Sequence, residues 1–166
     1  MAPYSPNYTP NPKLDLVLER TVAAPPAKVW AAWTKPEHVV KWFTPAPWVT
    51  TRCEIDLRPG GKFLTHGKGP DTPEGPHVTA CYLEIIEHRK LVWTTALLPG
   101  FRPGDVGIEM PAITAVILFE PAGSGTKYTA IAMHRDEGDN RKHEEMGFFD
   151  GWGTVTSQLE EFAKRL

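Results

Sequence analysis

The last part of this chain joins a helical pattern to residues that a helix disfavours. Gly147, Gly151 and Gly153 lie in its first half, although each glycine inside a helix costs about 1 kcal/mol relative to alanine. Large apolar residues nevertheless recur at alternating spacings of four and three, on one face of an amphipathic helix: Phe148, Trp152, Val155, Leu159, Phe162 and Leu166. The pattern predicts one long C-terminal helix, starting near Asp139, with bulky aromatic side chains beside empty positions.

Seven other segments have the alternation or the β-branched and aromatic content of strands: residues 14–22, 45–57, 63–67, 77–88, 90–98, 113–121 and 126–134. Glycine and proline mark the turns and loops between them: 59–61, 69–77, 98–111 and 123–125. After the first strand, residues 24–43 predict two short helices, because Pro25 suits a helix start and Pro36 ends the first helix.

This order of elements predicts an α+β fold of the helix-grip type. Short connections favour neighbouring antiparallel strands, so about seven strands would form one curved antiparallel sheet. Only the final helix is long enough to cover the concave face, because about 27 residues span about 40 Å. We expect Phe162 and Leu166 to close one end, and the glycine-rich half to leave an internal cavity at the other. The alternative is that the glycines only relieve crowding beneath the sheet.

Composition argues against several classes of partner. The 166 residues are 41% hydrophobic and 23% charged, with a formal net charge of −2 and no block of like charges, which argues against nucleic acid and an anionic membrane surface. The sequence contains no run of about twenty apolar residues, so no membrane span is predicted. No signal peptide is indicated either. Cys53 and Cys81 lack CxxC spacing, so we expect buried, reduced thiols in a cytoplasmic protein. We expect a flexible proline-rich arm over residues 1–13 and a single domain over residues 14–166.

The six histidines carry no metal-binding signature, because none forms HxH, HExxH or a cluster with cysteine. No metal and no cofactor is therefore predicted. His66 and His77 flank a loop, so a hairpin would bring them together at one rim of the sheet. There they could bind an anion, a metal or a substrate hydroxyl, or they could be solvated loop residues. His134 ends the last strand, where alternation places it with Ala130 and Ala132. It faces inward only if the small residues line the cavity.

The aromatic residues point to a binding cavity. Six tryptophans are distributed over helices, strands and loops that would surround one cavity. Tryptophan offers a large apolar wall with one N–H donor, which suits a mostly apolar ligand with a polar group. Plain core packing is the alternative, and the loop over residues 98–111 could act as a lid. The candidate ligand-binding residues are Trp42, Phe43, Trp93, Phe101, Met110, Met133, Phe149 and Trp152.

Several of these stretches, in this order, resemble one domain family. They are PAKVWAAWTKPEHVVKWF, CEIDLRPGGKF, YLEIIEHRKLVWT, the hairpin with its Gly-Thr pair and the Gly-Trp pair of the last helix. Over residues 14–166 the chain resembles the heat-shock-protein-90 ATPase activator-like family, within the START-like helix-grip (SRPBCC) superfamily. The resemblance implies a helix-grip fold with a hydrophobic cavity. It does not imply one function, because members carry apolar ligands, cyclise polyketides, or act as receptors or co-chaperones.

We therefore expect a domain that binds a small apolar or aromatic molecule, and a binding protein rather than an enzyme. One alternative is a cyclase, dehydratase or hydrolase acting on an aromatic or polyketide-like substrate, with His66, His77 or His134 as acid–base groups. Another is a stress-linked chaperone partner, which predicts an exposed apolar patch and a filled core. The separate N-terminal domain of the eukaryotic co-chaperone is expected to be absent, which weakens that alternative. Edge strands and the proline-rich arm leave room for a homodimer.

Overall fold

Seven antiparallel strands form the main sheet of the computed structural model, which describes residues 9–105 and 110–166. Their order across the sheet is β1-β9-β8-β5-β4-β3-β2. The strands are β1 (Asp15–Val22), β2 (Val49–Ile55), β3 (Lys62–Gly69), β4 (Thr72–Ile86), β5 (Lys90–Thr94), β8 (Thr114–Ala122) and β9 (Gly125–Met133). A separate ribbon pairs β6 (Leu97–Leu98) with β7 (Arg102–Pro103). The helices are α1 (Pro26–Thr34), α2 (Pro36–Val39), α3 (Glu137–Glu145) and α4 (Phe148–Ala163).

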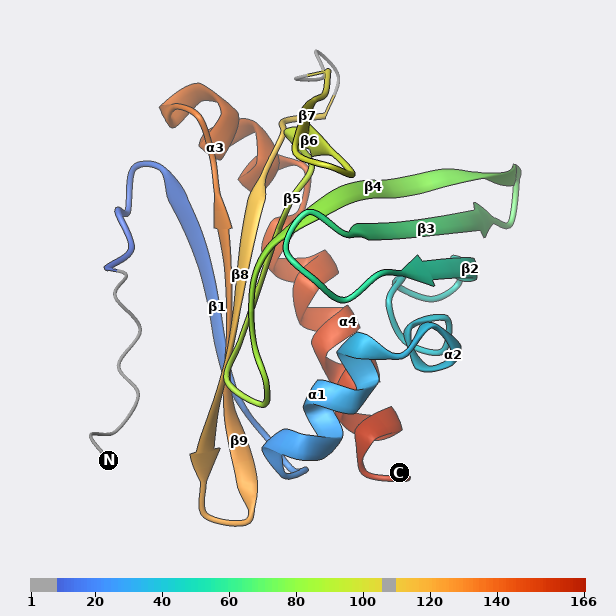
Figure 1. Ribbon diagram of the computed structural model, residues 1–166, viewed down its shortest axis with the longest axis vertical. Helices are drawn as coiled ribbons and strands as arrows, with labels where there is room; N and C mark the ends of the chain where they lie inside the picture. Colours follow the sequence, from blue (N-terminus) through green and yellow to red (C-terminus); the bar gives the residue numbers. More distant parts are fainter. Residues whose placement is uncertain (1–8, 106–109) are drawn as a thin grey trace.

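The sheet curves around α4. In Figure 1, β1, β8 and β9 run steeply down one side, β2, β3 and β4 turn away on the other, and α4 lies in the hollow between them. Two short helices follow the first strand, as predicted, and the antiparallel sheet has the predicted number of strands. The helix-grip fold predicted from the sequence is therefore confirmed.

Alternation along the central strands sorts their side chains into two layers. Ile117 of β8 and Ala130 of β9 join the main core, together with the aromatic residues of α1 and the buried face of α4. Val116 and Ile131, their neighbours in sequence, belong to a second cluster, because successive side chains of a strand point to opposite faces. The small residues of β9 therefore face the concave side of the sheet, which leaves space beneath α4.

The predicted C-terminal helix is present, but its predicted start near Asp139 is wrong, because the segment forms two helices, α3 and α4. Gly147, the residue directly before α4, has a φ of 96°, the left-handed conformation that glycine adopts without steric cost. Asp136 begins α3 by accepting a hydrogen bond from the backbone N–H of Asp139 at 2.8 Å. Of these two helices, α4 lies in the hollow of the sheet, and α3 lies at its upper end in Figure 1.

The far end of α4 also differs from the prediction. Leu166 is exposed, so the expectation that it closes this end of the fold is wrong. Phe162 does pack against the main core, and its ring centroid lies 5.2 Å from that of His38. The end of the fold is therefore closed by Phe162 and the fully buried Leu159.

The predicted loop over residues 69–77 is wrong as well, because β4 begins at Thr72 and includes most of it. The prolines of this stretch, Pro73 and Pro76, are tolerated because β5 begins to pair with β4 only at Cys81. The first half of β4 therefore has a free edge, where a residue without an N–H loses no ladder hydrogen bond.

The chain enters β1 through a fixed turn. The carbonyl oxygen of Asn11 accepts hydrogen bonds from the N–H groups of Leu14 and Asp15 at 3.0 and 2.8 Å. The N–H of Asn11 donates in turn to Oδ2 of Asp15 at 2.7 Å. The first eight positions of the predicted flexible arm lie outside the described residues.

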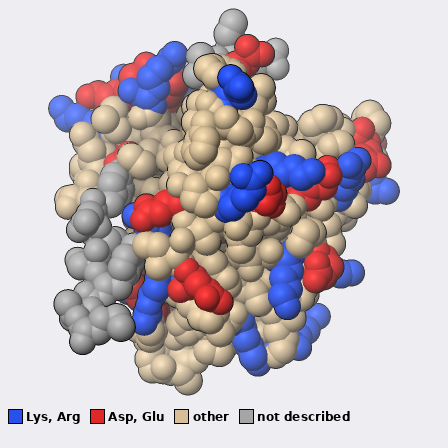
Figure 2. All heavy atoms as spheres, in the orientation of Figure 1, with Lys and Arg blue, Asp and Glu red and all other residues tan. Residues whose placement is uncertain are grey.

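Figure 2 shows basic and acidic side chains side by side across the middle of the visible face, and mostly basic ones at its lower right. Several basic side chains lie beside acidic ones; Lys62 and Arg52, for example, both contact Glu54. Among the described residues, no helix has both the length and the apolar content needed to cross a membrane.

Candidate ligand-binding site

A cavity of about 600 Å³ lies between α4 and the concave face of the sheet. Ligand pockets in proteins typically measure about 300–1,000 Å³, so this space is large enough for a small organic molecule. Residues of α4 form one wall: Phe148, Gly151, Trp152, Val155 and Thr156. Residues of β4, β5 and β9 form the facing wall: His77, Val78, Thr79, Trp93 and Tyr128.

A cluster of aromatic rings forms the wall where α1 meets the sheet. The ring centroid of Trp33 lies 4.9 Å from that of Trp42 and 6.5 Å from that of Trp93. Nε1 of Trp33 donates to the Tyr128 hydroxyl at 3.1 Å, which fixes both side chains. Burial raises the pKa of Tyr128, so its hydroxyl stays protonated. The wall is thus apolar and rigid, with polar hydrogens at fixed positions.

Trp93 holds a hydrogen-bond donor that no described residue accepts. Its Nε1 atom is buried and has no hydrogen-bond partner among the described residues, although the ring lines the cavity. Buried polar groups are normally paired, so this donor is an exception among the buried polar groups of the described residues.

The three glycines of the C-terminal segment have different roles. A Cβ added to Gly151 would meet no heavy atom within 4 Å, and Gly151 lines the cavity. A Cβ added to Gly153 would lie 3.0 Å from Nη2 of Arg20, so this position brings β1 close to α4. Gly147 provides the break between the helices. Gly151 therefore lines the cavity, whereas Gly153 relieves crowding between β1 and α4.

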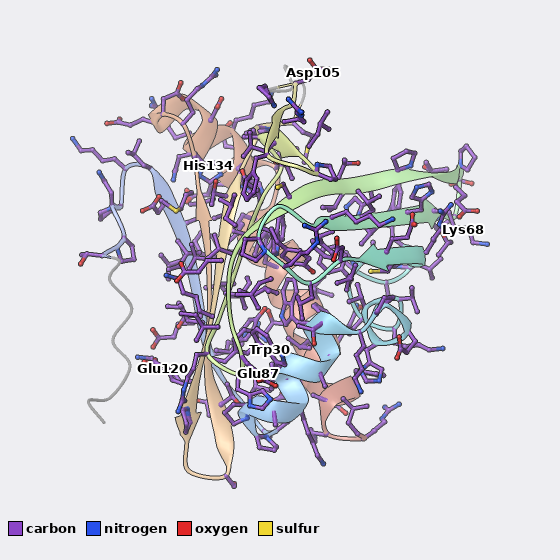
Figure 3. The ribbon with its side chains drawn as sticks, viewed as in Figure 1. Trp30, Lys68, Glu87, Asp105, Glu120 and His134 are labelled. Carbon is purple, nitrogen blue, oxygen red and sulfur yellow. The ribbon has the colours of Figure 1, made fainter. Side chains whose placement is uncertain are left out.

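The cavity opens to solvent between the segment before β8 and the α3–α4 break. Asp105, Met110 and Met146 line it there, and all three are exposed. Figure 3 labels Asp105 and His134 at this end of the molecule and Trp30 toward the other end. The predicted lid over residues 98–111 includes residues 106–109, which lie outside the described residues.

Among the predicted acid–base histidines, His77 lines the cavity. Its ring centroid lies 6.0 Å from that of Phe43, and the loss of surrounding water lowers its pKa, so it is neutral at pH 7. His66 lies opposite Pro76 in the β3–β4 register, next to His77, but its side chain is not part of the cavity wall. The two histidines are neighbours across β3 and β4, as the sequence indicated, but of the two His77 alone lines the cavity.

His134 faces the concave side, with Ala130 and Ala132, and is buried. Its Nδ1 lies 2.9 Å from the carbonyl oxygen of Leu14, and its Nε2 lies 2.8 Å from Nδ1 of His143. Sequence reasoning gave no role to His143, a residue of α3 whose ring lines the cavity. Burial, with the nearby His134 as a second cause, lowers the pKa of His143 to about 4.

Comparison with known proteins identifies the family of this domain. The family model described as Activator of Hsp90 ATPase homolog 1-like protein matches residues 23–164. The chain belongs to this family. A crystal structure of a protein from Nitrosomonas europaea is 45% identical, with a TM-score of 0.87, and the match covers 93% of this chain and 97% of that one. No match was found among functionally curated proteins.

More distant members of this fold show the architecture alone. A solution NMR structure of a protein from Arthrobacter aurescens is 23% identical, with a TM-score of 0.77, and covers 93% of this chain and 88% of its own. A crystal structure of a protein from Rhodobacter sphaeroides is 17% identical, with a TM-score of 0.79, and covers 95% and 97%. The helix-grip architecture is thus retained while most of the sequence changes.

In this activator-family domain, five of the residues named from the sequence line the cavity: Phe43, His77, Trp93, Met110 and Trp152. The other candidates lie elsewhere. Trp42 is fully buried behind Trp33 and donates to the carbonyl oxygen of Ala32 at 3.0 Å. The ring of Phe101 lies over the turn at Gly60, where an added Cβ would be 2.6 Å from its Cε2.

Met133 and Phe149 also lie away from the cavity. Met133 packs in the second cluster, on the face of the sheet opposite α4. Phe149 is exposed, and its ring contacts that of Phe148 with the centroids 5.0 Å apart. No group of three or more metal-ligating side chains converges among the residues that the structure describes.

Proposed function

We propose that this domain binds one small, largely apolar molecule with an aromatic part in the cavity between α4 and the sheet. The observation that carries the proposal is Gly151. Alanine at this helix position would be more stable by about 1 kcal/mol, and its Cβ would meet nothing within 4 Å. No steric constraint therefore explains the glycine at position 151. A cavity that must stay open at this point explains it.

The walls of the cavity support the same ligand class. Trp93 and Trp152 offer flat apolar faces, and Met110 borders the opening. Phe43 also lines the cavity, with its ring centroid 5.8 Å from that of Trp33. Aromatic rings prefer offset or edge-to-face contacts with other rings, so this arrangement favours a planar aromatic ligand over a flexible chain.

The test is a titration with the neutral apolar dye N-phenyl-1-naphthylamine, followed by its fluorescence. The wild-type protein is expected to bind one dye molecule. Gly151→Phe and Ala112→Phe fill the cavity from two different walls, and each should weaken binding at least about tenfold. Phe149→Ala is the matched control, because it removes an aromatic ring of α4 outside the cavity and should leave the affinity unchanged.

Binding without turnover is proposed because, of the acid–base residues predicted from the sequence, His77 alone lines the cavity. A chaperone-partner function predicts a filled core, which does not fit a space of about 600 Å³. Absence of dye binding in the wild-type protein would favour that function instead.

The free thiols of Cys53 and Cys81 support a cytoplasmic location as part of this proposal. Burial raises the pKa of Cys53 to about 12, so this thiol stays protonated.

A further inference from the structure

The hydrogen-bond chain through the two buried histidines has a direction. A carbonyl oxygen can only accept, so Nδ1 of His134 carries the hydrogen that is donated to Leu14 at 2.9 Å. A neutral imidazole carries one hydrogen, so Nε2 of His134 accepts. Nδ1 of His143, at 2.8 Å, must then be the donor. Burial lowers the pKa of His143, which keeps this ring neutral, so it carries a single hydrogen.

This direction leaves an acceptor on His143. Because its single hydrogen is on Nδ1 and is donated to His134, its Nε2 carries a lone pair. No hydrogen bond within the described part of the protein uses that atom. The ring lines the cavity, and because Nδ1 is turned to His134, Nε2 points away from His134.

The surroundings of this acceptor are apolar. The ring centroid of His143 lies 5.2 Å from that of Phe148 and 6.5 Å from that of Trp152. A hydrogen bond formed among such rings is stronger than one formed in water, because little solvent competes for it. The position is also fixed, since His134 holds the ring from one side and Phe148 contacts it edge-on.

We infer that Nε2 of His143 accepts a hydrogen bond from the ligand, so that the cavity selects aromatic molecules that carry an acidic hydroxyl, such as phenols or enols. His134 is a positioning residue, because it fixes which nitrogen of His143 is unprotonated and does not touch the ligand. This inference rests on the proposed function, since it assumes that an aromatic molecule occupies the cavity.

The first test needs no ligand. Two-bond proton–nitrogen NMR correlations on the full-length protein at pH 7.5 report which ring nitrogen of each histidine carries the hydrogen. The expected result is the Nδ1–H form for both His134 and His143. A hydrogen on Nε2 of His143 would overturn the inference, because that atom would then be a donor.

The second test compares matched probes by equilibrium dialysis. The measured quantity is the ratio of the affinity for 2-naphthol to the affinity for 2-methoxynaphthalene. This ratio should be about five- to tenfold lower in His143→Phe than in the wild-type protein. His77→Phe removes the other histidine of the cavity wall and should change the affinities for both probes alike. The phenylalanine variants keep a ring at each position.

The outcomes separate the two proposals. If neither probe binds the wild-type protein, the proposed binding function fails. If both probes bind but the ratio is the same in His143→Phe as in the wild type, the binding function holds and the role of His143 is refuted. If only His77→Phe loses the preference for 2-naphthol over 2-methoxynaphthalene, the acceptor is His77, and the role of His143 is again refuted.

Discussion

The glycines of the C-terminal segment yield the sharpest stability prediction, because three alanine substitutions within seven positions should differ in sign. Gly151→Ala should stabilise the protein. An alanine at this position of α4 gains about 1 kcal/mol of helix propensity, and its Cβ meets no atom within 4 Å that would offset the gain. For a protein of this length, that corresponds to a rise in Tm of about 2–4 °C.

Gly147→Ala should have the opposite effect. With a φ of 96°, this position requires the left-handed conformation, which costs a residue with a Cβ about 1–2 kcal/mol. Gly153→Ala should lie between the two, because its Cβ would approach Nη2 of Arg20 at 3.0 Å, and that side chain also donates to Ser157 at 2.8 Å. The gain in helix propensity is then offset by the displacement of Arg20.

The free energies of unfolding of the three variants can be measured by urea denaturation followed by far-ultraviolet circular dichroism. We expect Gly151→Ala and Gly147→Ala to differ by about 2–3 kcal/mol. A destabilised Gly151→Ala variant would refute the view that this position borders empty space. A stable Gly147→Ala variant would refute the assignment of the helix break to backbone conformation.

Three further predictions concern the turn, the aromatic wall and the buried histidine. Gly61→Ala places a Cβ 1.9 Å from the carbonyl oxygen of Asp56 and should lower the free energy of unfolding by about 3 kcal/mol, measured in urea; a loss below 1 kcal/mol would contradict the close approach seen there. Tyr128→Phe leaves the buried Nε1 of Trp33 without an acceptor and should cost about 1–3 kcal/mol in the same assay, whereas no loss would mean that this bond contributes nothing. The pKa of His143 falls from 6.5 to about 4 on folding. Below pH 6.5 the unfolded chain therefore binds more protons than the folded protein. The free energy of unfolding that depends on a neutral His143 is fully present above pH 6.5 and is lost as the pH falls to about 4. Between these pH values, the stability of His143→Phe should fall less steeply than that of the wild type; parallel curves would contradict the lowered pKa.

The fold could be predicted from the sequence because its signals are local and repeated. Strand alternation, the turns at Gly60 and Gly123 and the prolines that delimit α1 act within a few residues of where they lie. The break at Gly147 was missed because a glycine within an amphipathic pattern fits either a helix interior or a helix boundary. Only its φ of 96° distinguishes the two.

The cavity residues were harder to predict, because their role depends on which strand pairs with which. Periodicity placed Met133 on one face of β9 and His134 on the other, but it could not say which face was concave. His143 was missed since its partner lies on a different element and is bonded through a ring nitrogen. The only local signal was its place on the same chain segment as Phe148 and Trp152, the aromatic residues that it contacts.

The most direct test of ligand binding is native mass spectrometry on the wild-type protein and on Gly151→Phe, both purified gently from the natural host. We predict that the wild-type protein carries one small aromatic molecule with a hydroxyl group, released on denaturation, and that the variant is recovered without it. A wild-type protein that is empty, or a variant that carries the same molecule at the same occupancy, would contradict binding in the cavity beside α4.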